Sequence, residues 1–143
     1  MIRGYNEEDQ NSVLDVWYKA STLAHPFLEE AFVEKVRTDM RELYLPNSKT
    51  WVYVENNIVL GFISMIENEI GGLFVLPDHH SKGIGTKLVN YMQKYHSELE
   101  VEVFEANLIG SAFYDKYGFK FLEELKHEET GNRILRLTFK FQN

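Results

Sequence analysis

Apolar and polar residues follow two different periods along this chain. Four segments repeat apolar residues every three to four positions, which is typical of an amphipathic helix, and seven shorter segments alternate or run apolar, which is typical of a β-strand. Helices are expected after Asn6, after His25-Pro26, over 83–97 and over 109–117. Strands are expected over 2–5, 50–55, 58–66, 70–76, 99–104, 119–125 and 134–141.

Local signals mark where several of these elements begin and end. Asn6, followed by three acidic residues, suits the N-cap of the first helix, because its side chain accepts from free N–H groups and the acids favour the helix dipole. Pro46-Asn47-Ser48 is expected to end the second helix. Asn56-Asn57 predicts a two-residue hairpin turn, since Asn tolerates positive φ. Gly118 predicts a left-handed cap on the last helix.

The element order is β-α-α-β-β-β-α-β-α-β-β. The helix between the fourth and fifth strands predicts a parallel crossover, and the rest of the sheet is expected to be antiparallel. We therefore expect a mixed α/β (α+β) fold: a mostly antiparallel sheet of about seven strands, with a parallel pair formed by the fourth and fifth and helices on both faces. With 143 residues, 44% of them hydrophobic, the chain suits one domain over 1–143.

Composition narrows the classes of function. The formal net charge of −7 argues against non-specific nucleic-acid binding. Cysteine is absent, which excludes disulfides, thiolate metal sites and a cysteine nucleophile. The longest apolar run, 58–66, is too short to cross a bilayer, and the N-terminus lacks a signal-peptide pattern. We expect a cytoplasmic protein with no nucleic-acid or membrane partner.

The stretch from Leu73 to Leu88 is the most informative, because it reads as a buried strand, a polar turn and the start of a helix. Gly83-Ile84-Gly85 lies just before that helix. Free N–H groups at the start of a helix lie at the positive end of its dipole, and glycine lets a ligand approach the backbone. The turn therefore predicts a phosphate or pyrophosphate site. Its spacing does not fit a Walker loop, and a dinucleotide motif would need a third glycine.

Two motifs resemble the GNAT superfamily of N-acetyltransferases. Val75-x-Pro77 with His80-Ser81-Lys82-Gly83-Ile84-Gly85 is similar to the family's acetyl-CoA loop, Gln/Arg-x-x-Gly-x-Gly/Ala. The segment 107–119 is similar to its second signature, Asn-x-x-Ala-x-x-Phe/Leu-Tyr-x-x-x-Gly-Phe. This chain has His80 where Gln or Arg is usual and Gly110 where Ala is usual.

The resemblance implies that acetyl-CoA is the cosubstrate. The fourth and fifth strands would splay apart around its pantetheine arm, beside the backbone of 74–76, and the Val75 N–H would polarise the thioester carbonyl. Backbone N–H groups of 82–86 would hold the pyrophosphate, and the Asn107 amide would contact the arm. The residues expected at the cofactor are thus Phe74, Val75, His80, Lys82, Gly83, Ile84, Gly85, Thr86 and Asn107.

The implied chemistry is direct attack by a primary amine on the thioester. Tyr114 matches the family tyrosine that donates a proton to the departing thiolate. A base must first deprotonate the ammonium, whose usual pKa is about 10.4. Glu67 and Glu69, in the turn before the fourth strand, and His25 are the candidates, and the sequence does not choose among them. We expect the side chains of Asp78-His79-His80 to lie at the surface and not to form a metal site.

Several acceptors remain open. A protein lysine is favoured slightly, and the alternatives are a protein N-terminus or a small amine such as a polyamine, an amino acid or an aminoglycoside. A CoA-binding sensor without turnover is the alternative from another class. The expected oligomeric state is a monomer or a homodimer.

Overall fold

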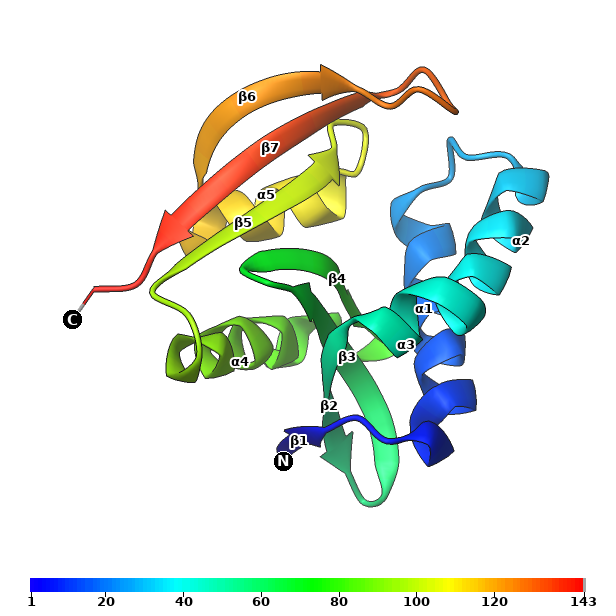
Figure 1. The fold of residues 1–143 in the computed structure, drawn as a ribbon, viewed down its shortest axis with the longest axis vertical. Helices are drawn as coiled ribbons and strands as arrows, with labels where there is room; N and C mark the ends of the chain where they lie inside the picture. The colour runs from blue at the N-terminus through cyan, green and yellow to red at the C-terminus, as the bar shows by residue number, and fades with distance from the viewer. Residues whose placement is uncertain (143) are drawn as a thin grey trace.

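A seven-stranded mixed sheet organises the protein, in the order β1-β2-β3-β4-β5-β7-β6 (Figure 1). This computed structural model describes residues 1–142. All neighbouring strands are antiparallel except β4 and β5, which are parallel. The strands are β1 (Ile2–Gly4), β2 (Lys49–Glu55), β3 (Ile58–Ile66), β4 (Glu69–Val75), β5 (Glu98–Phe104), β6 (Lys120–Lys126) and β7 (Arg133–Lys140).

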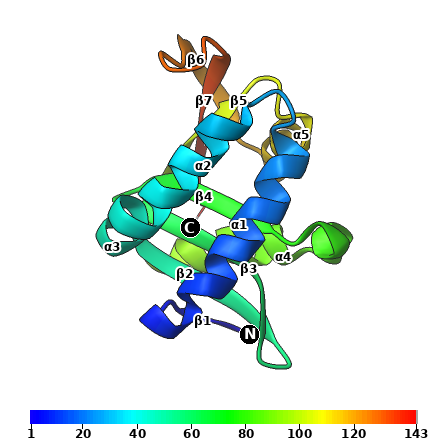
Figure 2. The same ribbon diagram turned by 90° about the vertical axis from the view of Figure 1, so that its right-hand side faces the viewer.

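Helices cover both faces of the sheet, as expected. Figure 2 shows α1 and α2 across one face, with α4 on the other side of β2–β4. The main helices are α1 (Gln10–Ala24), α2 (Glu30–Asp39), α4 (Ile84–Tyr91) and α5 (Leu108–Tyr117). Shorter helical segments are η1 (Glu7–Asp9), η2 (Met40–Tyr44), α3 (Leu45–Asn47), η3 (Pro77–Lys82) and η4 (Met92–Lys94).

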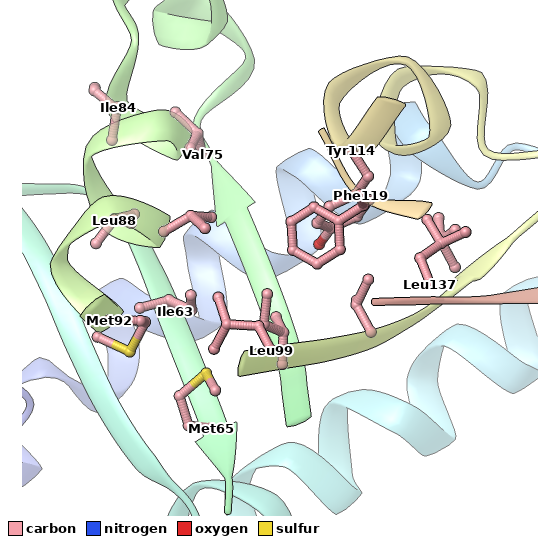
Figure 3. Packing of buried hydrophobic residues seen from close by; sticks show 14 of the residues in the cluster. Ile63, Met65, Val75, Ile84, Leu88, Met92, Leu99, Tyr114, Phe119 and Leu137 are labelled. Carbon is pink, nitrogen blue, oxygen red and sulfur yellow. The ribbon is translucent and has the colours of Figure 1, made fainter. Parts of the chain in front are cut away.

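The alternation of side chains along the strands produces two cores. Phe62 and Ile63 are neighbours on β3 and both are fully buried, but they belong to different clusters. Phe62 packs beneath α1 and α2 with residues such as Val13 and Trp17. Ile63 packs with the inner side of α4 and with β5, α5 and β7 (Figure 3). The sheet therefore separates two compartments with different helices.

The sheet opens between β4 and β5. Their pairing consists of Glu69 with Glu100 and Ile70 with Val101, at the N-terminal ends of the two strands. Beyond these pairs the strands diverge, and β4 continues to pair with β3 alone as far as Val75. The predicted splaying of the fourth and fifth strands is therefore present.

Most boundary signals are confirmed. The Asn6 side chain caps the first helical turn, and the Asp9 carboxylate accepts a hydrogen bond from the Asn6 N–H. Asn56 and Asn57 have φ of 52° and 64°, and Gly118 has φ of 115° as the cap of α5.

The helix end expected at Pro46-Asn47-Ser48 is confirmed, because η2 leads directly into α3, which has Pro46 in its first turn and ends at Asn47 before the extended Ser48. Two boundaries were wrong. The helix expected over 83–97 is shorter, because α4 gives way to η4 after Tyr91. Glu69 is the first residue of β4, paired with Ile66, and not part of the turn.

Candidate active site

A cavity of about 920 Å³ lies beside the C-terminal part of β4, between α4 and α5. Figure 3 shows two of its lining residues, Val75 and Tyr114, on elements that face each other. Its walls come from β4, from the start of α4, from α5 and from the end of β7. They include Leu73, Val75, His80, Gly83, Gly85, Thr86, Ile109, Phe113, Tyr114, Tyr117 and Phe139.

The edge of β4 presents a backbone donor toward this opening. The Leu76 N–H donates to the Leu60 carbonyl of β3 at 2.8 Å. Successive N–H groups of a strand point to opposite edges, so the Val75 N–H points away from β3 and toward the gap left by β5. The family resemblance implies that this N–H faces a ligand, and the register of β3 and β4 gives it a direction that allows this.

His80 occupies part of the same edge. Its Nε2 lies 2.7 Å from the Val75 carbonyl oxygen, which can only accept, so Nε2 carries the hydrogen. This bond fastens η3 to the end of β4. His80 therefore reaches the cavity, but its ring is directed at the strand backbone. The expected contact to a pyrophosphate stays a prediction.

The start of α4 offers free backbone donors. Gly83 adopts a left-handed conformation with φ of 75°, and no side chain caps α4. The Gly83 carbonyl accepts its first bond from the Lys87 N–H, so the N–H groups of 84–86 have no partner within the helix. A Cβ at Gly85 would lie 3.2 Å from the Phe113 ring. Glycine here thus serves the packing of α4 against α5 as well as ligand approach.

Tyr114 lies on the opposite wall from this loop. It is only 6% exposed and packs edge-on against Phe113 and Phe119 while lining the cavity. Burial raises the pKa of its hydroxyl above the usual range, so the group stays a phenol and a hydrogen donor at neutral pH. Within residues 1–142 the hydroxyl has no protein hydrogen-bond partner, which leaves it available to a ligand.

A second pocket of about 400 Å³ lies on the other face of the sheet, beneath α1 and α2. β4 borders both spaces, because Phe74 lines this pocket and its neighbour Val75 lines the larger cavity. An aromatic cluster gathers at the pocket, with neighbouring ring centroids 5.3–5.7 Å apart. The aromatic cluster consists of His25, Phe27, Phe32, Phe104 and His127.

The charges around the second pocket are mainly negative. Glu69, Asp39 and Glu129 supply three carboxylates, and Lys35 supplies one ammonium group, which pairs with Glu129 at 2.9 Å. Carboxylates and aromatic faces both favour a cationic ligand. The pocket therefore suits an amine in its ammonium form.

The two candidate glutamates do not have the same position. Glu69 lines the second pocket, and its Oε1 accepts a hydrogen bond from Arg136 at 2.9 Å. Arg136 also pairs with Glu100 and Glu102. Its hydrogen bonds to Glu69 and Glu100 raise its pKa above the usual range. Glu67 is exposed in the β3–β4 turn with φ of 54° and lines neither space. The structure thus separates two residues that the sequence treated alike.

His25 lines the second pocket and is held on both sides. Its Nδ1 lies 3.0 Å from Ser21 Oγ, and its Nε2 lies 3.2 Å from the Asn107 amide nitrogen. Burial lowers its pKa to about 4, so the ring is neutral at physiological pH. Asn107 does not line the larger cavity. Its expected contact with the cofactor stays a prediction.

The remaining cofactor residues are spread over these surroundings. Lys82 is exposed and bonds His79. Ile84 is buried in the core, so it can face a ligand only through its backbone. Sequence reasoning did not single out Ser21, His127 or Arg136. They come from separate elements, and no local spacing links them to the site.

The family is decided by comparison with known proteins. Residues 46–121, more than half of the chain, match the family model described as "Acetyltransferase (GNAT) domain". The chain belongs to the GNAT family of acetyltransferases. The expected family and fold, and the expectation of an N-acetyltransferase, are therefore confirmed.

Individual relatives agree with this GNAT assignment over nearly the whole chain. The peptidyl-lysine N-acetyltransferase YiaC of Escherichia coli K12 is 31% identical over 131 residues, covering 91% of this chain and 90% of YiaC. The peptidyl-lysine N-acetyltransferase YjaB of Salmonella typhimurium is 30% identical, covering 83% of this chain and 82% of YjaB.

Solved structures share the same GNAT fold. The solution structure of apo-form YjaB from Escherichia coli has a TM-score of 0.86 and 26% identity, covering 96% of this chain and 95% of that one. The PaiA N-acetyltransferase of Thermoplasma acidophilum, crystallised with coenzyme A, has a TM-score of 0.81 and 21% identity, covering 97% and 98%. The second likeness concerns the fold alone. Among residues 1–142, none of the helices has the length and apolar character needed to cross a membrane.

Proposed function

We propose that this protein is a peptidyl-lysine N-acetyltransferase that uses acetyl-CoA and acts in the cytoplasm. One observation carries the proposal: β4 separates a cavity with free backbone donors from a pocket with aromatic rings and carboxylates. The first suits a phosphorylated acyl donor, and the second suits an ammonium group on an apolar stem. Two relatives are named for acetyl transfer to peptidyl-lysine, which supports the same acceptor class.

The larger cavity fits acetyl-CoA through its backbone groups. The N–H groups at the start of α4 would receive the pyrophosphate, because they are uncapped and lie at the positive end of the helix. The open edge of β4 would receive the pantetheine amides. The Val75 N–H would polarise the thioester carbonyl, and one fixed donor of this kind contributes about 10²–10³ in rate.

Acetyl-CoA, when bound, supplies the acetyl thioester. The amine nitrogen forms a bond to the carbonyl carbon, and the bond from that carbon to sulfur breaks. Tyr114 donates its hydrogen to the departing sulfur, for which its buried phenol is suited. A base first removes one proton from the ammonium group, and the second proton, which the nitrogen loses as the amide forms, balances the one that Tyr114 gives to sulfur.

Glu69 is the base we propose in preference to Glu67. Glu69 lines the acceptor pocket, and its bond to Arg136 uses Oε1 and leaves Oε2 for another donor. Glu69→Gln should lower kcat about tenfold or more, whereas Glu67→Gln should stay within about twofold. Steady-state kinetics of both variants across pH 6–9 would measure this. Equal loss in the two variants would remove Glu69 from this role.

Acetyl transfer to defined amines tests the acceptor. Acetyl-CoA is offered with a lysine peptide blocked at its N-terminus, a lysine-free peptide with a free N-terminus, spermidine, free lysine and an aminoglycoside, and acetylated products are identified by mass spectrometry. We expect kcat/KM for the blocked lysine peptide to exceed that for the other amines about tenfold or more.

The other outcomes are equally informative. Preference for the free N-terminus or for a small amine would replace the proposed acceptor and keep the acetyltransferase. Binding of acetyl-CoA without turnover of any amine would favour the CoA-binding sensor. Failure to bind acetyl-CoA at all would overturn the proposal.

A further inference from the structure

The side chain of Asn107 is fixed by two hydrogen bonds at the start of α5. Its Oδ1 accepts from the Gly110 N–H at 2.8 Å, which caps the helix. Its Nδ2 lies 3.2 Å from His25 Nε2, on the connection between α1 and α2. Asn107 is 8% exposed. One buried amide therefore joins the α5 helix to the loop of the second pocket.

These bonds determine the proton on His25. A backbone N–H can only donate, so the Asn107 atom that faces Gly110 is the oxygen, and the atom that faces His25 is the NH₂ nitrogen. That nitrogen can only donate, so His25 Nε2 accepts. The ring hydrogen is then on Nδ1 and is donated to Ser21 Oγ at 3.0 Å. The lone pair of Nε2 is engaged, which argues against His25 as the base.

Gly110 makes this arrangement possible. A Cβ at this position would lie 2.5 Å from Asn107 Nδ2 and 3.1 Å from Val103 Cγ2. Real Cβ atoms do not approach other atoms to 2.5 Å, so an alanine would turn the Asn107 amide out of its place. This chain has Gly110 where the motif usually has Ala, and the glycine leaves room for the Asn107 amide that reaches His25.

The hydrogen bond between Asn107 and His25 connects the second pocket with the helix that carries Tyr114. His25 packs edge-on against Phe27 and Phe104 in the aromatic cluster. Asn107 caps the helix that carries Tyr114 into the larger cavity. We infer that His25 is a positioning residue, which holds Asn107 and, through it, sets α5 and Tyr114 relative to the acceptor loop. The inference rests on the proposed function and concerns the same site.

Matched variants of His25 separate positioning from packing. His25→Phe keeps the ring but cannot accept a hydrogen bond, whereas His25→Gln places an oxygen acceptor about where Nε2 lies. With the lysine peptide as acceptor, we expect His25→Phe to lower kcat about fivefold or more, with KM for acetyl-CoA within about twofold. His25→Gln should restore most of the rate. Equal rates in the two variants would overturn the inference, because the acceptor atom would then be irrelevant.

Gly110→Ala should break the same Asn107–His25 hydrogen bond by displacing the Asn107 amide. Alanine favours a helix more than glycine does, so the fold should be retained. We expect Gly110→Ala to lower kcat about as much as His25→Phe, and the double variant to lose little more than either alone, since both break one link. Losses that multiply in the double variant would contradict a shared link.

A spectroscopic measurement tests the link without turnover. The ¹⁵N shifts of the His25 ring should report a neutral ring with hydrogen on Nδ1 in the natural protein, and a changed tautomer balance in Gly110→Ala. Hydrogen on Nε2 in the natural protein would overturn the inference. If no amine is acetylated, the proposed function fails, and these shifts still decide whether the link exists.

Discussion

The two spaces on either side of β4 are built in different ways. The larger cavity takes its donors from the backbone of one continuous stretch, β4 through the start of α4. The second pocket takes its character from side chains of α1, α2, β3, β4, β5 and the β6–β7 turn. Backbone donors need only a fold and a few glycines, whereas a side-chain pocket depends on many separate residues.

This difference fits two kinds of ligand. Acetyl-CoA is common to the family, so a binding site made of backbone groups can serve any member whatever its side chains. The acceptor differs between members, and a pocket lined by side chains from many elements can change without altering the sheet. The following variants test whether the division into a backbone-built donor site and a side-chain-built acceptor site holds.

Removing the Tyr114 hydroxyl should give the largest effect. Tyr114→Phe keeps the packing against Phe113 and Phe119, and we expect kcat to fall about 100-fold or more while the affinity for acetyl-CoA changes little. Steady-state kinetics and calorimetric titration with acetyl-CoA would measure the two effects. Tyr95→Phe, at a position 53% exposed, is the control and should keep its rate. An unchanged rate in Tyr114→Phe would remove this residue as the donor.

A carboxylate at the start of α4 should weaken the donor site alone. Gly85→Asp brings a negative charge to the proposed pyrophosphate seat, and we expect the Kd for acetyl-CoA to rise about thirtyfold, or about 2 kcal/mol. Gly85→Ala measures the steric part, because its Cβ meets only the Phe113 ring. Gly4→Asp controls for added charge, since nothing lies within 4 Å of a Cβ there. Unaltered affinity in Gly85→Asp would place the phosphate seat elsewhere.

Acidification should lower the stability of the folded protein through His25, which lines the second pocket. Its pKa is about 4 in the folded protein and about 6.5 when unfolded, so between these values the unfolded chain binds more protons. Stability is therefore full above about pH 6.5 and falls as the pH approaches 4. We expect a loss on the order of 1–2 kcal/mol relative to His25→Gln, measured by urea unfolding at pH 7 and 4.5. Parallel losses in the two proteins would show that other groups are responsible.

Loss of the His80 ring should have the smallest effect. His80→Ala removes one bond to the Val75 carbonyl, and we expect about 0.5–1 kcal/mol lower stability and at most a threefold change in Kd for acetyl-CoA. Thermal unfolding and titration would measure both. A much larger loss of affinity would mean that the donor site depends on a side chain after all.

The larger cavity could be predicted from the sequence better than the second pocket, for a physical reason. The glycine turn follows from signals within a short stretch, because strand alternation and helix capping are local. The splayed fourth and fifth strands and the role of Tyr114 were implied by the resemblance to the family, whose motifs are also short. Glu67 and Glu69 could not be separated, since that depends on which of them meets Arg136 of β7, 67 residues beyond Glu69. Likewise, the bond between Asn107 and His25 could not be predicted, since it joins residues that are 82 positions apart in the sequence.

The sequence by itself determined the element order, the caps at Asn6 and Gly118, the two-residue turn at Asn56 and the family. Each depends on backbone preferences or side-chain periods within a few residues. Only the tertiary structure decided how far β4 and β5 pair, which rings form the aromatic cluster and where the Asn107 amide points. Those features depend on contacts between distant elements, whose geometry is set by packing the sheet between two layers of helices.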